Sequence, residues 1–164
     1  MKVLTLSREV VARLLRMDGC MEAMAGALKT LSRGDGINPL RDVVRLPDDG
    51  YLMVMPGYLG DPGVMAVKSV SGFPENHAAG FETHQGAIVL FEGNHGRLLA
   101  LIDAQEITAV RTAAVSGVAT QVLARDDAVD LALIGCGVQA HTHLNAMRIA
   151  RDIRRVRVWS RTPE

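Results

Sequence analysis

The segment at residues 129–140 constrains the fold of this chain more than any other. A short apolar run in it leads into the glycine-rich turn Gly135-Cys136-Gly137-Val138-Gln139-Ala140. A helical pattern follows over residues 138–151, and residues 156–159 resemble a second strand. A strand, a glycine-rich turn, a helix and a second strand, in this order, are typical of the first βαβ unit of a dinucleotide-binding fold.

The glycine-rich turn has small residues where such a fold requires them. Gly135 permits the tight turn, Gly137 lets a pyrophosphate approach the backbone, and Ala140 lets the helix pack closely on the strand. The helix N-terminus offers free N–H groups and a partial positive charge to the phosphates. An ordinary strand–helix turn without a ligand and a methyltransferase-type nucleotide site are the alternative interpretations.

Composition excludes several other classes of protein. The chain has 164 residues, 48% of them hydrophobic, which suits one domain or two small ones. Its 18 basic and 18 acidic residues balance, which argues against electrostatic binding to nucleic acid or an anionic membrane. We expect neither a signal peptide nor a transmembrane helix. Only Cys20 and Cys136 are cysteines, and a disulfide at Cys136 would obstruct the turn, so a reducing, cytoplasmic compartment is expected.

The region before this turn has the pattern of an α+β domain. Helices are expected at residues 8–16 and 19–32, with Ser7 and Asp18 as N-caps. Strands are expected at residues 1–5, 42–46, 51–55, 64–70, 86–91 and 97–102. Their close spacing favours a mostly antiparallel sheet. A long alanine-rich helix at 104–124, capped by Asp103, then leads into the second region.

Three basic residues are candidates for binding a substrate carboxylate. Lys68 lies in an otherwise apolar strand, where an unpaired buried ammonium would be costly. Arg111 lies on the alanine-rich helix, and Arg41 follows a turn. Together they could clamp a carboxylate, which guanidinium groups bind bidentately. The alternative is that Lys68 and Arg111 simply face water.

The end of the second strand bears on the choice of cofactor. NAD-preferring folds place an acidic residue there for the ribose 2′-hydroxyl, but this chain has Ser160-Arg161-Thr162. A guanidinium flanked by two hydroxyls suits a 2′-phosphate, so NADP(H) is favoured and NAD(H) is possible. A polar turn without a ligand is the alternative. No His/Cys cluster has metal-ligand spacing.

Taken together, these motifs resemble the ornithine cyclodeaminase/mu-crystallin family along the whole chain. The motifs that carry the resemblance are Val54-Met55-Pro56-Gly57-Tyr58, Lys68 in its strand, Thr83-His84-Gln85-Gly86, Ile107-Thr108 with Arg111-Thr112-Ala113-Ala114, and the glycine-rich turn.

The resemblance implies an α/β fold with two parts and an active site between them. Residues 1–110 would form an α+β substrate-binding and dimerisation domain. Residues 111–164 would form the first βαβ part of a Rossmann-type NAD(P)-binding domain. Because a doubly wound sheet needs more than two strands, we interpret the chain as the truncated, N-terminal part of a longer family member.

The resemblance also implies roles for single residues. Arg41, Lys68 and Arg111 match the substrate-carboxylate binders of the catalytic centre. Matches to cofactor contacts are Thr112, Gly137, Val138 and Gln139, with Ser160, Arg161 and Thr162 at the adenosine-ribose end. The catalytic aspartate of the family lies beyond Glu164.

The implied activity is that of an NAD(P)-dependent enzyme, acting as a homodimer on an amino acid or a cyclic imine. It would either convert ornithine to proline with loss of ammonia or reduce a ketimine, and Arg161 slightly favours the reductase. One alternative is a mu-crystallin-like protein that binds NADPH and a small ligand without turnover. Another is an inactive fragment held together only by dimerisation.

Overall fold

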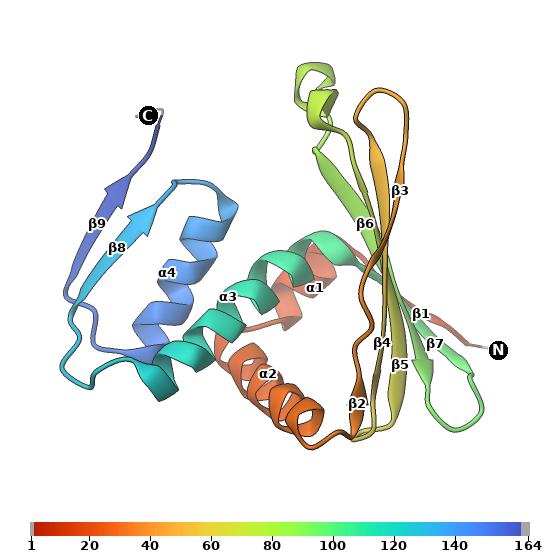
Figure 1. Ribbon diagram of the computed structural model, residues 1–164, viewed down its shortest axis with the longest axis horizontal. Coiled ribbons are helices and arrows are strands. Elements are labelled where there is room, and N and C mark those ends of the chain that lie inside the picture. Colours follow the sequence, from red (N-terminus) through yellow and green to blue (C-terminus); the bar gives the residue numbers. More distant parts are fainter. Residues whose placement is uncertain (1, 162–164) are drawn as a thin grey trace. The chain divides into compact units, whose positions relative to one another are not determined.

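The computed structural model describes residues 2–161, apart from the side chain of His77. The chain folds into two compact units (Figure 1). Met1–Leu14 and Ala27–Ile107 form the first unit, and Leu15–Gly26 and Thr108–Glu164 form the second. The units are therefore not two consecutive stretches of chain. That the first binds substrate and the second binds a nucleotide stays a prediction.

A seven-stranded sheet dominates the first unit. Its strand order is β1-β7-β6-β5-β4-β2, and β3 also pairs with β4. Among the described strands of this sheet only β1 and β7 pair in parallel, so the predicted mostly antiparallel sheet is confirmed. The strands are β1 (Leu4–Leu6), β2 (Gly36–Ile37), β3 (Asp42–Arg45), β4 (Tyr51–Leu59), β5 (Val64–Gly72), β6 (His84–Glu92) and β7 (Leu98–Asp103), with a 3₁₀ helix at Pro74–Ala79.

Strand β4 is longer than predicted, because it continues through Pro56. Proline cannot donate to a ladder and is tolerated where that donor has no partner. On the outer edge of β4, β3 pairs with Tyr51–Val54 and β2 pairs with Tyr58 and Leu59. Pro56 lies in the gap between these two pairings, which explains why the strand accepts it.

The two N-terminal helices depart from the predicted boundaries, since the first ends at Leu14 and the second begins at Met17. Helix α1 (Arg8–Leu14) begins after Ser7, as predicted, and the Val10 N–H donates to the Ser7 hydroxyl at 3.4 Å. Helix α2 (Met17–Ser32) begins before Asp18, so the prediction of Asp18 as N-cap was wrong. The Asp18 carboxylate instead accepts hydrogen bonds from the Arg16 guanidinium (2.8 Å) and from the Gly19 N–H (2.9 Å).

The two faces of the sheet differ in how deeply their side chains are buried. Lys68, Met55 and Ile88 share a row on one face, and the buried Val70 and Ala100 lie on that same face. Helix α1 packs against β7 (Figure 1). The opposite face carries apolar side chains that are not buried, among them Val54, Pro56, Tyr58, Val67, Val89 and Leu101. We call these six residues the open sheet face.

The second unit contains the predicted βαβ arrangement. Strands β8 (Asp130–Ile134) and β9 (Arg155–Trp159) pair in parallel and are joined through α4 (Val138–Ala150). Helix α3 (Ala104–Leu123) begins in the first unit and continues into the second, where it packs in a core of small residues. The buried residues of that core are Cys20, Met21, Val110, Ala113, Ala114, Ala146 and Ala150.

None of the helices in the described part of the chain combines the length and apolar composition that a bilayer crossing requires. The described residues also contain no group of three histidine, cysteine or acidic side chains placed to hold a metal ion.

Candidate nucleotide-binding site

The glycine-rich turn leaves directly from the β8–β9 ladder. The Gly135 N–H donates to the Trp159 carbonyl at 2.7 Å, and the φ angle of Gly135 is +110°. That region of backbone conformation strongly favours glycine, so the sequence requires a glycine here for geometric reasons alone. Gly137 is the N-cap of α4, with extended backbone angles of −76° and −173°. A Cβ added at Gly137 would meet no atom within 4 Å.

The N-terminus of α4 is built to attract an anion. Among the described residues no side-chain hydrogen bond caps it, and no acidic residue lies in its first turn. The first N–H groups of a helix have no intrahelical acceptor, and the helix dipole adds a partial positive charge there. Val138 and Gln139, the first two residues of the helix, are both exposed. That their backbone N–H groups bind a phosphate stays a prediction.

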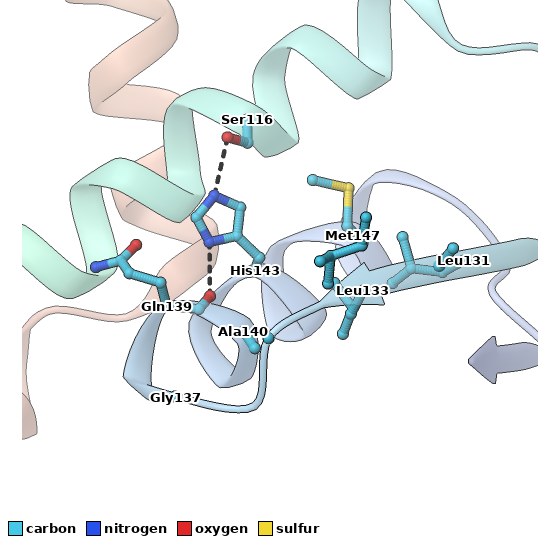
Figure 2. A pocket seen from close by; sticks show the side chains of 11 residues that line it. Ser116, Leu131, Leu133, Gly137, Gln139, Ala140, His143 and Met147 are labelled. Atoms are coloured by element: carbon cyan, nitrogen blue, oxygen red, sulfur yellow. Dashed lines mark hydrogen bonds between the residues drawn. The ribbon is translucent and has the colours of Figure 1, made fainter. Parts of the chain in front are cut away.

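A hollow of about 480 Å³ lies beside this turn. Figure 2 shows Leu131, Leu133 and Met147 on its apolar side. Gly137, Gln139 and Ala140 line it where α4 begins, and Ser116 of α3 and His143 of α4 line its polar side.

Ser116 and His143 are site residues that sequence reasoning missed. The Ser116 hydroxyl lies 3.1 Å from His143 Nε2, and His143 Nδ1 lies 2.7 Å from the Gln139 carbonyl oxygen (Figure 2). The spacing of four residues between Gln139 and His143 places both on one side of a helix, which is a usable signal. Nothing in the sequence distinguishes Ser116 from the other small residues of α3.

The adenosine-ribose end predicted from the sequence is only partly described. Ser160 is half-buried and its hydroxyl accepts from the Cys136 thiol at 3.2 Å. Arg161 is exposed. Thr162 lies outside the described residues. Both cysteines are free thiols. The pKa of the Cys20 thiol is raised by burial, and the nearby charge of Arg111 offsets part of this rise.

The predicted carboxylate clamp is distributed over both units. Within the sheet, Lys68 pairs with Met55 of β4, and Asp42 of β3 pairs with Val54, the neighbour of Met55. Arg41 directly precedes Asp42, so it lies next to Met55 in the sheet order. Lys68 is on the strand beyond Met55, two strands from β3. Arg111 is exposed on α3 in the second unit. The clamp of all three therefore stays a prediction.

Thr112, a predicted cofactor contact, lies next to Arg111 and is half-buried. Its hydroxyl donates to the Thr108 carbonyl at 2.6 Å, one turn earlier in α3. Its oxygen lone pairs can still accept a hydrogen bond, but its proton is engaged within the helix.

The Thr83-His84-Gln85-Gly86 motif has a structural explanation. His84 Nε2 lies 2.8 Å from the Tyr51 hydroxyl, and its Nδ1 lies 3.1 Å from the Thr83 hydroxyl. A Cβ at Gly86 would lie 2.3 Å from the Ser69 carbonyl oxygen, so only glycine fits there. These residues join β4, β5 and β6 at one end of the sheet.

Comparison with known proteins identifies the family of this chain. The model of the ornithine cyclodeaminase/mu-crystallin family matches residues 1–164. The chain belongs to this family. The resemblance stated from the sequence motifs is confirmed, as is the mixed α/β fold.

Members of the family similar to this chain include several oxidoreductases. The mouse ketimine reductase mu-crystallin is 35% identical over 97% of the chain and 52% of its own length. A structure of the Thermococcus litoralis Delta(1)-pyrroline-2-carboxylate reductase with NADH and L-proline has 38% identity and a TM-score of 0.92, over 98% of this chain and 50% of that one. An archaeal alanine dehydrogenase dimer with bound NAD has 32% identity and a TM-score of 0.93, over 98% and 49%. The chain thus spans about half the length of these relatives.

Proposed function

We propose that this chain provides the nucleotide-phosphate turn and part of the substrate site of an NAD(P)-dependent oxidoreductase of the ornithine cyclodeaminase type. The observation that carries this proposal is the uncapped N-terminus of α4 behind Gly135 and Gly137, with no acidic residue in its first turn. The solved relatives with NADH and NAD support a nicotinamide cofactor. The exposed Arg161 favours NADP(H), because its guanidinium could pair with a 2′-phosphate.

The proposed substrate is an amino acid or a cyclic imine, with reduction of a ketimine favoured. When bound, the nicotinamide supplies or accepts a hydride at the substrate α-carbon. Arg41, Lys68 and Arg111 would hold the substrate carboxylate and thereby fix the position of that carbon, and such orientation contributes much of the rate. The reductase relatives support this direction. The alternative is an ornithine cyclodeaminase that releases ammonia and forms proline.

We also propose that the protein forms a homodimer. The open sheet face is an apolar surface on the first unit, and surfaces of this kind mark association sites. The alanine dehydrogenase relative, which is described as a dimer, supports this assignment.

The proposal is tested by titrating the protein with NADPH and NADH while following the fluorescence of Trp159, the only tryptophan, at the end of β9. We expect Gly137→Val to abolish binding with little loss of stability, because its side chain would enter open space where a phosphate must approach. Gly26→Val is the matched control, since Gly26 of α2 also meets no atom within 4 Å. Arg161→Asp should weaken NADPH binding more than NADH binding.

Three outcomes separate the candidate functions. Tight binding of NADPH or NADH that Gly137→Val leaves unchanged would refute the turn as the site. Binding without turnover of any amino acid or ketimine would favour the mu-crystallin-like alternative. Turnover that Lys68→Ala leaves unchanged in kcat/KM would remove Lys68 from the substrate site.

A further inference from the structure

His143 occupies a position where both nitrogens of its ring have partners. Nδ1 lies 2.7 Å from the Gln139 carbonyl oxygen, which can only accept a hydrogen bond. Nδ1 must therefore carry a proton. In the neutral ring Nε2 is then an acceptor, and the Ser116 hydroxyl, 3.1 Å away, donates to it.

This bond links two helices near the glycine-rich turn. Gln139 is the second residue of α4, and Ser116 belongs to α3. The imidazole therefore joins the first turn of α4 to its neighbouring helix. A second polar contact between these helices, from the Thr120 hydroxyl to Met147 Sδ at 3.2 Å, lies one turn further from Gly137.

The link has a donor and an acceptor for either charge state of the ring. When His143 is protonated, Nε2–H donates to the Ser116 oxygen, and the Ser116 hydroxyl turns to the Thr112 carbonyl, 3.4 Å away. Among the described residues that line the hollow, His143 is the only one with a titratable side chain, so no carboxylate there neutralises the charge. The ring lies about one and a half helical turns after Gly137.

We propose that His143 is a positioning residue of the nucleotide-phosphate turn. It ties the first turn of α4 to α3 through Ser116, and its protonation adds positive charge behind the uncapped helix end without breaking the tie. The inference rests on the proposed nucleotide function and adds pH as a determinant of affinity.

The test is the dissociation constant of NADH measured between pH 5.5 and 8.5. NADH is the probe because it lacks the 2′-phosphate, which titrates in this range. We expect the unmodified protein to bind NADH severalfold more tightly when His143 is protonated, because the added positive charge attracts the pyrophosphate. His143→Gln, which can still reach Ser116 but stays neutral, should remove this pH dependence and retain the affinity measured at high pH.

Ser116→Ala and Thr120→Val separate positioning from general stability. Ser116→Ala suits a helix and should weaken NADH binding severalfold at every pH while retaining the fold. Thr120→Val removes the Thr120–Met147 contact between the helices and should leave binding unchanged. The inference, but not the proposed function, would be overturned if Ser116→Ala bound NADH as tightly as the unmodified protein. The same holds if His143→Gln kept the pH profile of the unmodified protein. If the unmodified protein binds neither NADH nor NADPH, the proposed function is overturned as well.

Nitrogen NMR of His143 gives an independent check, because a neutral ring protonated at Nε2 would contradict the assigned tautomer.

Discussion

At the scale of single residues, steric exclusion explains part of the Thr83–Gly86 motif. Gly86→Ala would place a Cβ 2.3 Å from the Ser69 carbonyl oxygen and 3.0 Å from the Val70 Cα, both backbone atoms. Because backbone yields less readily than a side chain, we expect a loss of about 1–3 kcal/mol in the free energy of unfolding. Denaturant unfolding measures it. Gly57→Ala is the control, since its nearest neighbour lies at 3.7 Å; equal stability of the two variants would contradict the steric explanation.

Asp18 gives the first helix junction a dependence on pH. Hydrogen bonds from the Arg16 guanidinium and the Gly19 N–H lower the pKa of Asp18 from 3.8 to about 2. The folded state therefore binds this proton more weakly than the unfolded state, and the stabilisation is present above about pH 4 and lost as the pH falls to 2. Asp18 is exposed, so the effect should be small.

The prediction is checked with Asp18→Asn by thermal unfolding at several pH values. Asp18→Asn should have a lower Tm than the unmodified protein at pH 6, and this difference should shrink between pH 4 and pH 2. Asp48→Asn, in the loop between β3 and β4, serves as the control for loss of a carboxylate. A difference in Tm that does not vary with pH would contradict the assigned cause.

At the scale of helices and strands, α3 and α4 approach closely because their contact residues are small. A Cβ at Gly117 would lie 2.8 Å from Met21 Cε and 3.1 Å from the Ala146 Cβ. Ala146 is completely buried. We expect Gly117→Val to destabilise the protein by about 1–3 kcal/mol through overpacking.

Gly26→Val again provides the matched control, because this glycine also lies in a helix but has open space around it. Denaturant midpoints of both variants measure the difference. If both variants lose the same stability, helix propensity rather than packing limits this position.

The elements that the sequence predicts best are those with local signals. Glycine spacing and helical periodicity predicted β8, α4 and β9, and the positive φ of Gly135 agrees with its expected role. Strand β2 was not predicted, because two residues show no periodicity. The extension of β4 through Pro56 was missed, because it depends on which segments pair along the outer edge of that strand. The Ser116–His143 bond depends on how α3 packs on α4, which no local pattern encodes.

At the scale of the whole molecule, the open sheet face allows a direct test of the proposed homodimer. Val67 and Val89 are paired on neighbouring strands in the middle of this face. Burying a carboxylate without a partner in an apolar interface is costly, so Val67→Asp should convert a dimer into a monomer. Light scattering after size-exclusion chromatography measures the mass.

Val122→Asp is the control, since Val122 is 76% exposed on α3 and does not belong to the sheet. It should leave the mass unchanged. An unmodified protein that is monomeric at micromolar concentration, or a Val67→Asp variant that remains dimeric, would refute the open sheet face as the interface.

The parallel pairing of β1 with β7 has a consequence for synthesis on the ribosome. Leu4 pairs with Ala100, so β1 must wait for a partner translated more than ninety residues later. At about 5–20 residues per second, this delay lasts on the order of 5–20 seconds. Hairpins β4–β5 and β6–β7 close over short loops and can form as they emerge, whereas β5 and β6 are joined through the 3₁₀ helix at Pro74–Ala79. The N-terminal strand is therefore expected to dock last, onto an edge that the rest of the sheet has already prepared.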